Sequence, residues 1–193
     1  MLNSQKRWFG LGLGVWILLA AGVLLAQTNQ PSQQQPMQNM KLSGADKDFM
    51  MKAAEGGIAE VMMSQMALSK SSNDEVKNFS QRMIDDHTKA NNELKDLASK
   101  KGVTLPTAPN AKQRSEQDRL NKMSGADFDR EYMRTQVKAH NETVALFDKE
   151  TRSGKDQETK SWADQTLPTL REHQRMANDL SSKLGGPLGK AGN

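Results

Sequence analysis

The feature that most constrains the fold is a helical spacing of apolar residues that continues from about Asp46 to Leu184. Apolar residues recur in steps of three and four, which is the spacing of one face of an α-helix. Nowhere in this stretch do β-branched residues alternate with polar ones, as they would in a strand. The sequence therefore predicts one all-α domain.

Capping residues and glycines divide this stretch into helices. Ser72 followed by Glu75 is the pattern of a capping box and predicts the start of the second helix, and Gly102 predicts its end. Ser124 followed by Asp127 resembles another cap. The expected helices span residues 46–70, from Ser72 to Gly102, 111–122, from Ser124 to Gly154, and 156–184.

Four of these helices are long and of similar length, so a four-helix bundle with an extra short helix between helices 2 and 3 is the economical architecture. Pro168 lies inside the last helix. Because proline lacks a backbone N–H, it predicts a kink or a restart there.

Each predicted long helix carries one polar residue on its apolar face. Alternating steps of three and four along the second helix pass through His87, and the same steps place His140 on the third and His173 on the fourth. On the first helix they place Glu60. With a rise of about 1.5 Å per residue, the four positions fall within about two turns of one another. Since neighbouring axes lie about 8 to 10 Å apart, we expect a polar layer across the middle of the bundle.

A carboxylate and three imidazoles form a suitable ligand set for one divalent transition metal (Zn, Fe, Cu, Mn or Ni), and bundle cores are an established place for such sites. The layer formed by Glu60, His87, His140 and His173 is thus a candidate metal site. The alternative is a metal-free hydrogen-bond network with a structural role. Both interpretations remain open from the sequence.

Two other metal chemistries are less well supported. A dinuclear carboxylate site carries Glu-x-x-His on two helices, but the residues three before the histidines are Ile84, Val137 and Leu170. Asp85 and Asp86 precede His87 off the apolar face, so we expect them to be solvated or to support a ligand rather than to bridge metals. The 12 methionines invite a Cu(I) site, but methionine more often fills irregular cores.

The N-terminus predicts export. Two basic residues, Lys6 and Arg7, precede an apolar run over residues 8–26, which fits either a cleaved signal peptide or an inner-membrane anchor. Residues 27–41 are rich in Gln and Pro and predict a disordered spacer, and residues 185–193 predict a flexible tail. The chain has no cysteine, so neither a lipoprotein anchor nor a disulfide can form.

The charge balance argues against nucleic-acid binding. Removing residues 1–26 takes away two basic and no acidic residues, which leaves 25 basic and 23 acidic ones. A nucleic-acid groove needs a one-sided basic surface, whereas here both signs alternate along every predicted helix.

Four segments resemble a known family: "AAEGGIAEV", "VKNFSQRMIDDHTKANNELKDLASKKGVTLP", "GADFDREYMRTQVKAHNETVALFDKE" and "TLPTLREH". They are similar to the bacterial domain of unknown function DUF4142, often labelled predicted outer membrane protein and grouped with ferritin-like folds. The resemblance covers about residues 46–184 and implies a ferritin-like bundle exported by a Gram-negative bacterium. It implies no function. An all-helical domain favours the periplasm over an outer-membrane span.

Two functions follow as hypotheses. The first is an exported periplasmic bundle, residues 42–184, that binds a transition metal through Glu60, His87, His140 and His173. The second is a non-enzymatic structural or partner-binding envelope module with a metal-free polar layer. No catalytic residues are indicated, and the protein partner is not predicted.

Overall fold

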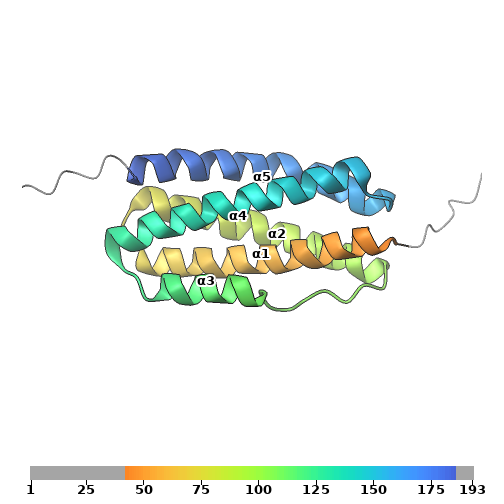
Figure 1. Ribbon diagram of the computed structural model, residues 1–193, viewed down its shortest axis with the longest axis horizontal. Coiled ribbons are helices and arrows are strands. Elements are labelled where there is room, and N and C mark those ends of the chain that lie inside the picture. Colours follow the sequence, from red (N-terminus) through yellow and green to blue (C-terminus); the bar gives the residue numbers. More distant parts are fainter. Residues whose placement is uncertain (1–41, 186–193) are drawn as a thin grey trace, which may run out of the picture. The chain divides into compact units, whose positions relative to one another are not determined.

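The computed structural model describes residues 42–185 (Figure 1). These residues form α1 (Gly44–Lys70), α2 (Asp74–Lys100), α3 (Ala111–Asn121), α4 (Gly125–Ser153) and α5 (Gln157–Leu184). Between residues 42 and 185 there is no strand, which confirms the all-α prediction. The expected leader, the spacer and residues 186–193 of the tail lie outside the described residues.

Side chains cap both α1 and α2, but the cap of α2 is not the predicted one. Ser43 and Asp46 form a capping box at the start of α1, with both bonds 3.1 Å long. The predicted Ser72–Glu75 box is wrong. Asn73 is the cap of α2, and its amide oxygen accepts from the backbone N–H groups of Glu75 (2.9 Å) and Val76 (3.2 Å). Asparagine caps as well as serine does, so the helix starts one residue later.

Two glycines with a left-handed backbone mark helix ends. Gly102 has φ +66° directly after the C-cap of α2, as expected for a C′ residue. Ser124 precedes α4 as predicted, but its side chain makes no capping hydrogen bond within the described part of the chain. Gly125 follows with φ +58°, so the chain enters α4 through a turn that glycine adopts without strain.

Helix α5 runs without interruption through Pro168, so the helix does not restart there. Proline frees the carbonyl group four residues before it, which belongs to Asp164. Both residues are exposed. Water can therefore satisfy the freed carbonyl, and the helix continues.

The four long helices form a ring in which α1 lies beside α2, α2 beside α5, α5 beside α4, and α4 beside α1. Figure 1 shows that the long connection after α2 returns along the bundle, so that α4 runs in the same direction as α2. The short α3 lies in this connection and packs on α1 and α4. One long crossover is the connectivity of ferritin-like bundles.

The core consists of two apolar clusters on either side of the predicted polar layer. One contains Phe49, Phe147 and Trp162, whose ring centroids lie 4.9 to 6.0 Å apart. The other contains Phe79 and Tyr132 together with Met63, Met83 and Met133. These buried methionines fill the core, as the sequence indicates. The three histidines fall between the two clusters along α2, α4 and α5, whereas on α1 Ala59 of the second cluster already precedes Glu60.

Candidate metal centre

Three helices bring the three histidines together in the core. His87 comes from α2, His140 from α4 and His173 from α5. Their ring centroids lie 5.3 to 5.7 Å apart, and all three are buried. One nitrogen atom of each ring lies within 4.8 Å of the corresponding atoms of the other two. Of residues 42–185, no other set of three or more histidine, aspartate and glutamate side chains places its ligand atoms so close together.

Two of the rings have their second nitrogen fixed by a hydrogen bond. His140 Nδ1 lies 3.0 Å from the backbone oxygen of Gln136, and His173 Nε2 lies 2.8 Å from Oδ2 of Asp86. Because a carbonyl and a carboxylate oxygen only accept, both ring nitrogens donate. A neutral imidazole that donates from one nitrogen carries a lone pair on the other, so His140 Nε2 and His173 Nδ1 are acceptors.

Those two acceptor nitrogens, and Nε2 of His87, are buried and have no hydrogen-bond partner among residues 42–185. Histidines that bind metals typically donate their other N–H to a carboxylate or a backbone carbonyl, which fixes the ring and its tautomer. His140 and His173 show this arrangement. The centre therefore offers lone pairs without internal partners.

The surroundings keep two of the imidazoles neutral. Burial lowers the pKa of His87 well below its usual range, and the neighbouring His140 and His173 lower it further. Burial also lowers the pKa of His173 to about 4, although Asp86 opposes this effect. Neutral imidazole is the form that binds metals, so these two rings are ready to bind at pH 7.

Glu60, the fourth residue of the predicted layer, is buried on α1 but lies outside the group of three close ligand nitrogens. Its Oε2 has no hydrogen-bond partner in the described chain. Burial raises the pKa of Glu60, and the nearby His140 opposes the rise. The structure thus joins the three histidines directly and places the carboxylate close to them without including it.

Asp86 is a site residue that the apolar spacing does not single out. It accepts from His173 across the α2–α5 contact, while the neighbouring Asp85 accepts from Gln81 on its own helix. Successive helical residues differ by about 100° around the axis. A residue just before a histidine on the apolar face therefore lies at the edge of that face, next to the neighbouring helix. This position was the sequence feature that could have identified Asp86 as a site residue.

A metal ion would need the rings slightly closer. Zn–N bonds of about 2.0 to 2.1 Å in a tetrahedral site put the ligand nitrogens roughly 3.3 Å apart. The nitrogens here lie within 4.8 Å of one another. Small rotations of the side chains can close this difference, because the backbone already holds the rings around one point.

The sequence matches a family model described as "Domain of unknown function (DUF4142)" over residues 31–180. No curated protein matches it. Among solved structures it is similar to a DUF305 protein from Streptomyces coelicolor, named as a predicted secreted protein. That match has a TM-score of 0.63 and 14% identity, and covers 74% of this chain and 94% of that one.

Two further structures are similar. A DUF305 fragment from Deinococcus radiodurans has a TM-score of 0.65 and 13% identity, and the match covers 74% of this chain and 98% of the fragment. A conserved hypothetical protein from Mycobacterium tuberculosis has a TM-score of 0.58 and 17% identity, with 77% of this chain and 97% of that chain covered. At these identities the similarity shows the fold alone.

Within the part of the chain that the structure describes, none of the helices is long and apolar enough to cross a membrane. The apolar run over residues 8–26, where an anchor is expected, lies outside that part.

Proposed function

The chain belongs to the DUF4142 family, and from this premise we propose that its bundle binds one divalent transition-metal ion through His87, His140 and His173. One observation carries the proposal. Three buried imidazoles meet, and one ring nitrogen of each finds no hydrogen-bond partner in residues 42–185.

A metal-free network accounts poorly for this arrangement. Leaving a buried polar group unpaired costs about 1 to 3 kcal/mol, and a whole domain is stable by only about 5 to 15 kcal/mol. Three such nitrogens close together would therefore lower the free energy of unfolding by a large fraction. One bound cation would satisfy all of them at once.

The chemistry of the three ligands limits which metal ions the site can bind. Neutral imidazole suits Zn, Cu, Fe and Ni, whereas oxygen ligands suit Mg and Ca. The chain has no cysteine, which leaves no thiolate to compete. Three protein ligands leave a fourth position for water or a carboxylate. These features favour a nitrogen-bound first-row metal.

We also propose that the domain acts after export, in the periplasm. The basic and apolar segment over residues 1–26 supports this, and one structurally similar protein is named as a predicted secreted protein. In the alternative form of this proposal, residues 8–26 are not cleaved and anchor the protein in the inner membrane.

The test is a calorimetric titration of Zn²⁺ into the exported protein after its metal has been removed with a chelator. We expect one equivalent to bind and the melting temperature to rise, since binding at 100 times the Kd stabilises by about 2.7 kcal/mol. His140→Ala should abolish both effects. Asn141→Ala, at the exposed neighbouring position, is the matched control and should preserve them. Absence of binding, or binding that survives His140→Ala, would contradict the proposal.

A further inference from the structure

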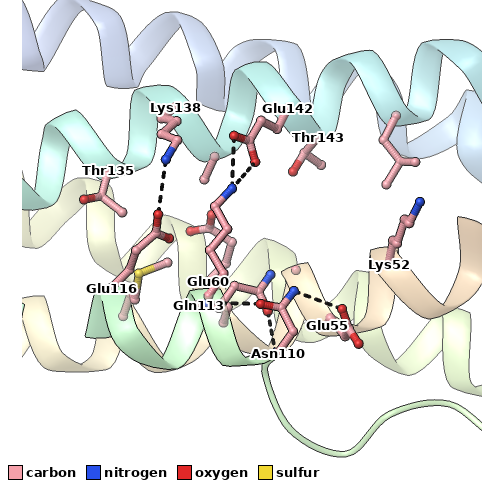
Figure 2. Close-up of a pocket in the computed structure, with 16 residues that line it drawn as sticks. Lys52, Glu55, Glu60, Asn110, Gln113, Glu116, Thr135, Lys138, Glu142 and Thr143 are labelled. Atoms are coloured by element: carbon pink, nitrogen blue, oxygen red, sulfur yellow. Dashed lines mark hydrogen bonds and ion pairs between the residues drawn. The ribbon is translucent and has the colours of Figure 1, made fainter. Parts of the chain in front are cut away.

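Two cavities that share lining residues lie near the proposed metal centre, and His87 is the one histidine that lines either of them. The outer cavity, of about 370 Å³, lies between α1, α3 and α4, and Figure 2 shows the side chains around it. The inner one, of about 30 Å³, lies next to His87. The two cavities share five lining residues: Lys52, Gly56, Glu60, Thr143 and Leu146.

Glu60 is the only carboxylate among these shared residues. It is 5% exposed, and its Oε2 is buried without a hydrogen-bond partner in residues 42–185. The side chain therefore borders both the space that opens toward solvent and the space that touches the metal centre.

The other carboxylates around the outer cavity already have partners. Lys112 forms an ion pair with Glu142 (3.2 Å) and Lys138 forms one with Glu116 (3.3 Å), and both pairs join α3 to α4. Figure 2 marks the pair between Lys138 and Glu116. The amide of Asn110 donates to Glu55 at 3.0 Å. Glu142 and Glu116 are thus paired with lysines and Glu55 is hydrogen-bonded, whereas Glu60 keeps a buried oxygen without a partner in residues 42–185.

We propose that Glu60 is a transient metal ligand, which receives a divalent cation from the outer cavity and passes it through the inner one to His87, His140 and His173. This inference rests on the proposed function. A route is needed because the three rings are buried, and a carboxylate is a common ligand for all the candidate metals. Its position outside the group of close nitrogens suits a relay better than a resident ligand.

The first test is a stopped-flow experiment in which the metal-free protein is mixed with Co²⁺. The visible absorption of the bound ion monitors the reaction. Glu60→Gln keeps the shape and removes the charge. A relay lowers the barrier in both directions, so association and dissociation should both slow by about tenfold while the Kd stays nearly constant. A rise in the Kd through faster dissociation would show a resident ligand, and unchanged rates would show no role. Either result overturns the relay.

The second test blocks the passage without touching a ligand. A Cβ added at Gly56 meets no atom within 4 Å, and Gly56 lines both cavities. Gly56→Leu should fold, because leucine is a better helix former than glycine. We expect Co²⁺ loading to slow by about tenfold, with the final stoichiometry unchanged.

The matched control is Asn92→Leu, at an exposed position that lines a separate cavity of about 450 Å³ without Glu60 or any histidine. It should load like the wild type. Loading of Gly56→Leu at the wild-type rate would overturn the route and leave the metal site standing. A wild-type protein that binds no Co²⁺ would overturn both.

Discussion

At the residue scale, the partner of the second ring nitrogen decides what a buried histidine can do. His140 donates to a carbonyl of its own helix, and His173 donates to Asp86 on α2. Each bond leaves the other ring nitrogen as a buried acceptor without a partner in residues 42–185. The steps of three and four predicted which histidines face inward, but not these bonds. The bond of His173 depends on how α5 is aligned with α2, which no single helix pattern contains, and the bond of His140 depends on the side-chain rotamer.

Asp86 should therefore support the metal centre. Asp86→Ala removes the acceptor that fixes His173, and loss of such a partner typically weakens metal affinity about 10- to 100-fold. Asp85→Ala is the control, since Asp85 bonds only within α2 in the described chain. Competition titration with a chromophoric chelator measures the metal affinity of both variants. Equal affinities in the two variants would exclude the supporting role.

Glu150 should make stability depend on pH. Burial and the neighbouring Asp46 carboxylate raise the pKa of Glu150 from 4.5 to about 7. The folded state then holds a proton that the unfolded state releases, so stability is present below about pH 4.5 and is lost as the pH rises to about 7. Allowing for screening, the loss is roughly 2 kcal/mol.

Glu150→Gln should remove this loss and raise the melting temperature at pH 8, with little change at pH 4.5. Glu93→Gln, at an exposed position of α2, is the control and should leave the pH profile unchanged. Thermal denaturation followed by circular dichroism between pH 4 and 8 tests the expectation. A wild-type profile in Glu150→Gln would refute it.

At the scale of the elements, the helices were largely predictable because apolar spacing and glycine position are local properties. The expected ends at Gly102 and Gly154 agree with the structure. The cap of α2 was misplaced because Ser72 and Asn73 are both good caps, and only the backbone path shows that Asn73 reaches the first N–H groups. The place of Glu60 outside the close group also followed from packing rather than spacing.

Two adjacent glycines of α1 should respond in opposite ways to alanine. A Cβ at Gly56 meets nothing within 4 Å, whereas one at Gly57 would lie 1.9 Å from Oδ1 of Asn91 on α2. Gly56→Ala should raise the free energy of unfolding by about 0.5 to 1 kcal/mol through helix propensity. Gly57→Ala should lower it by about 1 kcal/mol, because Asn91 must move. Urea denaturation measures the pair, and equal shifts would contradict the close approach of α1 and α2.

At the scale of the whole molecule, the direction of α4 was not predictable. The connection from Lys101 to Ser124 is long enough to return along the bundle or to stay at one end. The structure shows that it returns, with α3 packed on α1 and α4. This crossover completes the ring, and α3 lines one side of the outer cavity, so the proposed access route to the histidines depends on it.

Export is the prediction that concerns the full chain. The mature protein should begin near Gln27 and be found in the periplasmic fraction, because residues 1–26 have the form of a signal peptide. N-terminal sequencing after cell fractionation checks this. An intact N-terminus in the membrane fraction would favour the anchor, and unprocessed protein in the cytoplasm would contradict both forms of export.

The central claim is that three histidines from α2, α4 and α5 hold one metal ion. Anomalous diffraction at the zinc absorption edge, from crystals of the protein equilibrated with one equivalent of Zn²⁺, tests it most directly. The account predicts a single strong peak bonded to His87, His140 and His173, with Zn–N distances of about 2.0 to 2.1 Å. A peak elsewhere on the molecule, or no peak between these rings, would contradict it.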